Sequence, residues 1–164
     1  MTSRAPAMTS EVMDARPPAD ESGPMTDDTA APAPSLADLV AMMPFAAGMG
    51  IEVAAAEPEE VRGSMAWRPE LCTTFGAMHG GAMMAMADSI GAVCAFLNLP
   101  AGATTSTIES KTNFFRGVRA GSLHATSRPL HVGRATIVVQ TDLVDDRGKR
   151  VAQVTQTQAV LQPS

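Results

Sequence analysis

Residues 73–97 constrain the fold of this chain more than any other stretch. Their second half places apolar side chains at the three-and-four spacing of one helical face: Met83, Met86, Ala87, Ile90, Val93, Cys94 and Leu97. The rest of the helix surface is also mostly apolar or small, so the pattern predicts a helix buried on both sides, by a sheet and by a partner. Asp88 lies about 200° around the axis from Ile90. A carboxylate in such surroundings is costly unless it is paired or used in chemistry.

The sequence on either side of this helix predicts an α+β domain with an antiparallel sheet around it. Before it, we expect a short helix at 35–43, capped by Ser35 and ended by Pro44, then strands at 51–56 and 61–67. After it, four strands are predicted at 103–115, 121–130, 135–144 and 151–161. Pro129 implies a bulge or an edge near the end of its strand.

Composition excludes several classes of protein. The net charge of −5, the pI near 5.1 and the lack of a Lys/Arg run argue against a nucleic-acid partner. No apolar run reaches membrane-spanning length, so no membrane segment is expected. The two cysteines, far apart in sequence, favour a reducing cytoplasm. Residues 1–34 lack apolar periodicity, and we expect a disordered tail there followed by one domain at 35–164.

The start of the central helix carries a possible acyl-binding site. Gly80 and Gly81 follow His79, where the first helical amides have no intrahelical partner and the helix dipole favours negative charge. These amides form a plausible oxyanion hole for an acyl carbonyl, and glycine lets a ligand approach closely. Asp88 lies roughly 12 Å further along the axis at about 1.5 Å per residue. Because the two groups of one helix cannot reach one reacting carbon, the geometry predicts a dimer with antiparallel helices.

These residues resemble a known family. The run Gly76-x-x-His79-Gly80-Gly81, followed by Ala87-Asp88, is similar to the motif of hotdog-fold acyl-CoA thioesterases of the phenylacetate-degradation (PaaI-type) branch. Residues 107–116, which read Thr-Ile-Glu-x-x-x-Asn-Phe-Phe-Arg, and the later Gly133-Arg134 pair resemble the same branch. The match covers about residues 35–161 and implies a hotdog fold, in which the sheet wraps one long central helix.

The resemblance implies a catalytic role for five residues. Asp88 would be the general base for water or the nucleophile, and Gly80 would supply the oxyanion amide. His79 would help to position the loop and the thioester. Thr107 stands where these enzymes often carry a hydroxyl that orients water, although it could equally be an ordinary strand residue. Thr73 replaces a usual Asn, and its hydroxyl is shorter than an amide.

Further residues are implied as substrate contacts. The turn at Gly133 and Arg134 falls where relatives contact the coenzyme A arm, and Arg134 could meet a phosphate. Gly81, Asn113 and Arg116 complete the expected substrate-binding set.

Three functions compete at this stage. The first is hydrolysis of an acyl-CoA thioester by a homodimer or homotetramer. The second is a hotdog hydratase or dehydratase, whose Asp-x-x-x-x-His arrangement is absent because position 93 is Val93. The third is a non-catalytic acyl-CoA binder, which would be expected to lose the carboxylate that Asp88 provides. No metal or other cofactor is expected, since the three histidines lack zinc-site spacing. The sequence does not specify the acyl group, and aryl, short-chain and medium-chain groups are all compatible with it.

Overall fold

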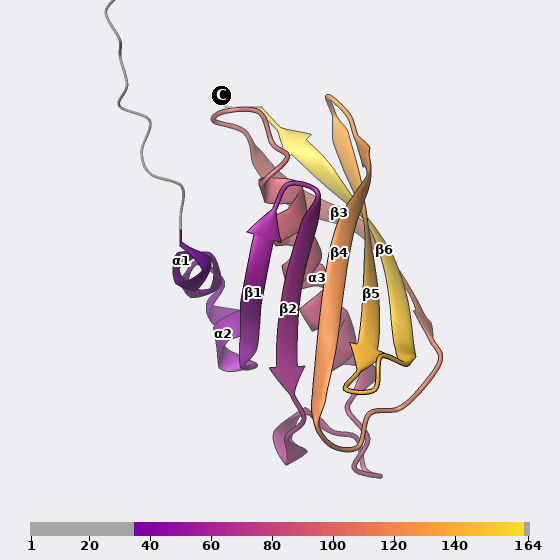
Figure 1. The fold of residues 1–164 in the computed structure, drawn as a ribbon. Coiled ribbons are helices and arrows are strands. Elements are labelled where there is room, and N and C mark those ends of the chain that lie inside the picture. The colour runs from indigo at the N-terminus through magenta and orange to yellow at the C-terminus, as the bar shows by residue number, and fades with distance from the viewer. Residues whose placement is uncertain (1–34, 163–164) are drawn as a thin grey trace, which may run out of the picture. The chain divides into compact units, whose positions relative to one another are not determined.

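The computed structural model describes residues 35–162, and the predicted tail at 1–34 lies outside the described residues. Two short helices come first, then two strands, a short 3-10 helix, the long helix and four more strands (Figure 1). Their bounds are α1 Leu36–Ala41, α2 Pro44–Gly48, β1 Ile51–Glu57, β2 Glu60–Ala66, η1 Pro69–Leu71, α3 Gly80–Phe96, β3 Thr104–Phe114, β4 Ser122–Val132, β5 Thr136–Asp145 and β6 Arg150–Leu161.

The six strands form one antiparallel sheet in the order β1-β2-β4-β5-β6-β3. This sheet curves over α3, which lies against its inner face (Figure 1). α3 connects β2 to β3, which end up at different places in the sheet, and β3 becomes an edge strand. The predicted α+β architecture, with the sheet packed around one central helix, is confirmed.

The apolar stripe of α3 packs on the sheet as predicted. Met83, Met86, Ala87, Ile90 and Cys94 are almost fully buried. Close packing of the helix depends on a glycine in β2, because a Cβ added to Gly63 would lie 2.5 Å from Cδ1 of Ile90. On the other side, the side chains of Met84 and Phe96 are 37% and 39% exposed. The second cover, by a partner, stays a prediction.

The N-terminal helix differs from the expected one. Ser35 caps α1 as predicted, and Asp38 completes a reciprocal capping box. The helix, however, ends at Ala41, and Pro44 begins α2 instead of only ending α1. The prediction was wrong here because proline, which has no N–H, is as well suited to the first position of a helix as to a helix end.

The strands follow the predicted ranges closely. The register between β4 and β5 shifts between Pro129 and His131, which confirms the predicted bulge. β4 runs two residues past the predicted end, to Val132. No described helix is long and apolar enough to cross a membrane.

Candidate active site

The His79 side chain caps the start of α3, and this hydrogen bond determines which ring nitrogen carries the proton. His79 is the N-cap residue, and its Nδ1 accepts a hydrogen bond of 2.8 Å from the Gly81 N–H. A nitrogen that accepts carries no proton, so the neutral imidazole holds its proton on Nε2. His79 is exposed, and its Nε2–H is therefore a donor directed away from the helix backbone.

In the first turn of α3, the backbone N–H of Gly80 has no hydrogen-bond acceptor among the described residues, whereas the following amides do. The Gly81 N–H is used by His79, and the next two amides bond to the His79 carbonyl. Within residues 35–162 the Gly80 N–H has no acceptor. The ring of Phe114 covers Gly80, since a Cβ at this position would lie 3.1 Å from the ring. The amide lies beside a hollow of about 370 Å³ that Phe115 and Arg116 also line.

Asp88 lies two helical turns further on, half-buried, and it contacts β3. The Thr107 hydroxyl lies 3.0 Å from Oδ1 of Asp88. The side-chain amide of Gln156 lies 3.3 Å from the Asp88 carbonyl oxygen and 3.4 Å from Oδ1. The structure thus brings together two predicted site residues, Asp88 and Thr107, and adds a residue from β6.

Gln156 and Gln158 of β6 were not predicted as site residues from the sequence. Gln156 is fully buried and Gln158 is 1% exposed, both on the sheet face toward α3. A signal was present, because they occupy the inward positions of an alternating strand between Val154 and Val160. Two polar residues in an apolar series are costly to bury, which marks them as members of a hydrogen-bonded network.

An apolar groove begins one turn beyond Asp88. Ala92 and Phe96 lie four and eight residues after Asp88, on the same side of α3, and they line a groove of about 330 Å³. α1, the residues after it and the start of β3 form the rest of the wall: Leu39, Met42, Met43, Thr104 and Thr105.

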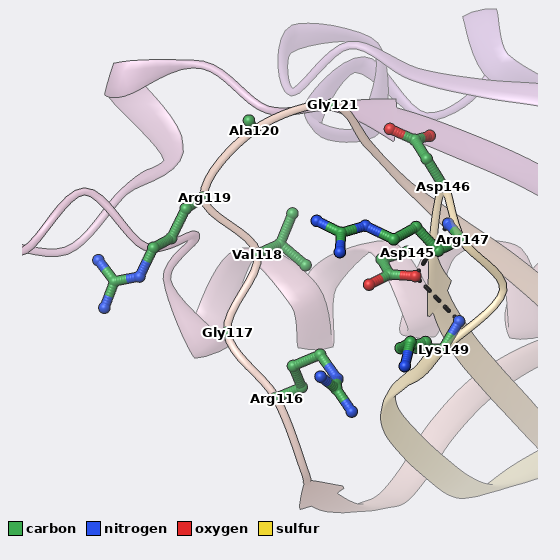
Figure 2. Close-up of a pocket in the computed structure, with 10 residues that line it drawn as sticks. All are labelled: Arg116, Gly117, Val118, Arg119, Ala120, Gly121, Asp145, Asp146, Arg147 and Lys149. Carbon is green, nitrogen blue, oxygen red and sulfur yellow. Dashed lines mark hydrogen bonds between the residues drawn. The ribbon is translucent and has the colours of Figure 1, made fainter.

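A basic pocket lies beyond the end of β3. It has a volume of about 480 Å³, and two segments form it: residues 116–121 and the turn between β5 and β6. Figure 2 shows Arg116 and Arg147 reaching into the space between these segments, whereas Arg119 points away. With Lys149, the lining has four basic residues against two aspartates. Arg116 and Gly117 also line the hollow beside Gly80, so the two spaces adjoin.

The two aspartates of the basic pocket are held by local hydrogen bonds. Asp145 accepts bonds from the backbone N–H groups of Lys149 and Arg147, and the first of these contributes most to lowering the pKa of its carboxyl. The hydrogen bond from His124 does the same for the pKa of Asp146, with help from the Ser122 N–H. The charges of Arg147 and Arg116 contribute smaller amounts to the lowering of the Asp145 pKa, and the Arg119 guanidinium donates to the Phe75 carbonyl oxygen.

The other predicted contact residues lie elsewhere. Gly133 and Arg134 form the turn between β4 and β5, where the Gly133 N–H bonds to the Thr136 carbonyl. This turn and the basic pocket lie at opposite ends of β4, roughly 30 Å apart at about 3.3 Å per residue. Asn113 is exposed on β3. Thr73 is exposed in the loop before α3, where its backbone bonds to Gly76 and Ala77. The structure therefore does not gather these residues around Asp88 within one subunit.

Neither cysteine is placed to act as a nucleophile. Burial raises the pKa of the Cys94 thiol to about 11, so it is a neutral thiol at physiological pH. The Cys72 thiol donates to the Arg68 carbonyl oxygen at 3.3 Å. In the part of the chain that the structure describes, no group of three His, Cys, Asp or Glu side chains is arranged to hold a metal ion.

Comparison with known proteins identifies the family of this chain. A family profile described as the thioesterase superfamily matches residues 75–152. A Mycobacterium tuberculosis protein named "putative esterase" is 31% identical over 121 residues, covering 72% of this chain and 86% of the relative. The 1,4-dihydroxy-2-naphthoyl-CoA hydrolase of Escherichia coli is 32% identical over 87 residues, covering 53% of this chain and 64% of the hydrolase.

A solved structure extends the comparison to the fold. A mutant thioesterase from Pseudomonas aeruginosa superposes with a TM-score of 0.75 at 30% identity, covering 79% of this chain and 95% of that one. The chain belongs to the thioesterase superfamily, has its hotdog fold and is a thioester hydrolase. The narrower assignment to the PaaI-type branch stays a prediction.

Proposed function

We propose that this protein hydrolyses acyl-coenzyme A thioesters in a site that two subunits share. The observation that carries this proposal is the arrangement of α3. Its Gly80 N–H has no acceptor within residues 35–162, and Gly80 lines a hollow, whereas the half-buried Asp88 contacts Thr107 two helical turns away. One subunit thus has both the Gly80 N–H and the Asp88 carboxylate, but the two groups of one chain cannot reach the same reacting carbon.

The chemistry follows from these groups. The thioester carbonyl oxygen would accept a hydrogen bond from Gly80 N–H, which stabilises the charge that develops on it. Asp88 of the other subunit would remove a proton from water as water attacks the carbonyl carbon, with Thr107 holding the carboxylate. The carbon–sulfur bond then breaks, and the products are a free acid and the coenzyme A thiol. Direct attack by the Asp88 carboxylate is the other route.

The two flanking spaces suit the two ends of the substrate. Coenzyme A carries phosphates, and arginine guanidinium groups bind phosphate well. The basic pocket adjoins the hollow beside Gly80 through Arg116, so an arm leaving the thioester there would reach it. The apolar groove beside Asp88 would take the acyl group, since Ala92 and Phe96 line it. The substrate we propose therefore has an apolar acyl group.

The edge strand supports the homodimer. β3 lies at one end of the sheet, and an uncovered edge offers unpaired backbone groups to another chain. Ile108, Phe114 and Phe115 expose 63%, 50% and 56% of their surface along or just after this strand. Antiparallel pairing of β3 with its copy would bring the Thr107 half of one strand toward the Phe114 half of the other. Such a pairing would bring Asp88 of one subunit near Gly80 of its partner.

Release of thiol from a panel of acyl-CoA thioesters tests the proposal. We include aryl and medium-chain substrates because the E. coli relative is named for an aryl-CoA substrate and the groove is apolar. Asp88→Asn is the matched control, and it should bind coenzyme A but lose turnover. Binding without thiol release by the wild type would favour the non-catalytic binder. Hydration of an enoyl-CoA without thiol release would favour the hydratase.

We also propose that the protein resides in a reducing cytoplasm, in keeping with its two free cysteines.

A further inference from the structure

Two buried glutamines lie on the sheet behind the Asp88 carboxylate. Gln156 and Gln158 come from β6, and their side chains are almost completely removed from solvent. A primary amide has two donors and an acceptor, and burying it is costly unless these groups are paired. The hydrogen bonds of the two side chains therefore indicate what they do.

Gln158 is held in one orientation by its neighbours on β3. Its Nε2 donates to Thr107 Oγ1 at 2.9 Å. Its Oε1 lies 3.2 Å from the Thr105 hydroxyl, whose one proton also has the Ala159 carbonyl oxygen as an acceptor at 2.9 Å. Because Thr107 Oγ1 receives the Nε2 proton, its own hydroxyl proton is free to point at Asp88 Oδ1, 3.0 Å away. The order of donors therefore runs from Gln158 through Thr107 to the carboxylate.

Gln156 reaches Asp88 without an intermediate. Its Nε2 lies within 3.4 Å of both the backbone oxygen and Oδ1 of Asp88. Gly91, three residues further along α3, makes room for the amide, because a Cβ there would lie 2.5 Å from Gln156 Oε1. That oxygen has no hydrogen-bond partner within the described residues. The amide is thus kept against the helix at the cost of one unpaired acceptor.

The hydrogen bonds of both glutamines lead to Oδ1 of Asp88, directly from Gln156 and through Thr107 from Gln158. Oδ1 of Asp88 receives the Thr107 hydroxyl and faces the Gln156 amide, whereas Oδ2 accepts no hydrogen bond from residues 35–162. We propose that Gln156 and Gln158 are positioning residues that fix the carboxylate by Oδ1 and leave Oδ2 to meet water or the acyl carbon. This inference rests on the proposed function.

The test compares three isosteric variants. Methionine has nearly the size of glutamine but cannot donate, so Gln156→Met and Gln158→Met remove the hydrogen bonds and keep the volume. Gln153→Met is the control, because Gln153 is also on β6 but donates to Asp142, at 2.9 Å. We expect each of the first two variants to lower kcat by about 10-fold with KM within about 2-fold, since a small misplacement of a reacting group slows the chemical step. The control should keep its kcat.

A double-variant series separates positioning from general loosening. Gln158 acts through Thr107, so Gln158→Met should have no further effect on kcat in a Thr107→Val background. Gln156 contacts Asp88 directly, and Gln156→Met should still lower kcat there. If Gln158→Met does not fold, Gln158→Glu keeps the length of the side chain, replaces the donating Nε2 by an acceptor and should give the same loss.

The possible results separate this inference from the proposed function. Wild-type thioester hydrolysis with an unchanged kcat in both glutamine variants would overturn the inference alone. The same holds for losses that equal those of Gln153→Met, or that follow the melting temperature. Failure of the folded wild type to hydrolyse any thioester would overturn the proposed function, and the positioning role with it.

Discussion

Thr107 Oγ1 lies 3.0 Å from Asp88 Oδ1, and this contact joins two residues that are 19 positions apart in the sequence. Asp88 belongs to the central helix, and Thr107 belongs to the edge strand β3. The carboxylate therefore lies where the helix meets an unpaired sheet edge, a position at which a second subunit could complete the site.

Thr107 should affect turnover more than binding. Thr107→Val keeps the shape of the side chain and removes the hydroxyl that donates to Asp88. We expect kcat to fall by about 10- to 150-fold, because the loss of a hydrogen bond to a charged group is worth about 1.5–3 kcal/mol. Thr107→Ser restores the hydroxyl and should recover most of the activity. Steady-state kinetics of both variants check this, and a loss in Thr107→Ser with an unchanged kcat in Thr107→Val would show that only the methyl group matters.

Asp88→Asn should remove most of the activity and leave the fold intact. The amide is nearly isosteric but cannot accept a proton from water, and loss of a general base costs about 10²–10⁴-fold. Loss of a nucleophile could cost more. The measurement is kcat on the best acyl-CoA, with thermal melting to verify folding. Turnover near the wild-type rate would mean that the carboxylate is structural.

The sequence was sufficient for the elements that depend on local pattern. The apolar period of α3, the Ser35 cap and the Pro129 bulge each follow from residues within a few positions of one another. The family resemblance implied that Thr107 orients the attacking water, but the contact of Asp88 with Thr107 was not predicted. Its distance depends on how β3 is placed against α3, which no local pattern fixes.

Other features depended on register and could not be predicted locally. The basic pocket forms because the residues after β3 face the β5–β6 turn, and only the sheet order brings Arg116 near Arg147. Gln156 and Gln158 reach the site because β6 lies beside β3. The sequence also placed Arg134 with the substrate contacts, yet within one subunit β4 separates it from the basic pocket.

Removal of basic side chains should identify the arginines that bind the phosphate-bearing arm of coenzyme A. Arg116→Ala and Arg147→Ala should raise KM, and added salt should weaken the difference from wild type, because screening reduces the attraction to phosphate. Arg134→Ala tests the alternative contact at the β4–β5 turn. Arg62→Ala is the control, since Arg62 pairs with Glu60 on β2. A rise of KM in the Arg134 variant alone would contradict the role of the basic pocket.

The start of β4 should loosen in acid. Asp146 accepts from His124 at 2.8 Å and from the Ser122 N–H at 3.0 Å, and these bonds lower its carboxyl pKa below the ordinary 3.8. A group with a lowered folded pKa stabilises the fold above the unfolded value and loses that contribution as pH falls through the folded value. The melting temperature should therefore drop more steeply below about pH 4 in the wild type than in Asp146→Asn. Parallel curves would show that the carboxylate does not hold this segment.

The shared site makes a prediction that one subunit alone cannot fulfil. Gly80→Trp blocks the oxyanion end, because even a Cβ at this position lies 3.1 Å from the Phe114 ring. Asp88→Asn removes the carboxylate, so each parent dimer should be inactive. In a mixed dimer, one site receives both damaged groups, whereas the other pairs an intact Gly80 with an intact Asp88. We therefore expect one working site of two.

Differently tagged chains, refolded together and purified by both tags, give the mixed dimer for this measurement. Its kcat per dimer should reach about half that of the wild type if two sites act independently. Mixing each parent with itself in the same way controls for refolding. No recovery in verified mixed dimers would show that Gly80 and Asp88 of one chain serve one site, which the roughly 12 Å between them on a straight helix makes difficult.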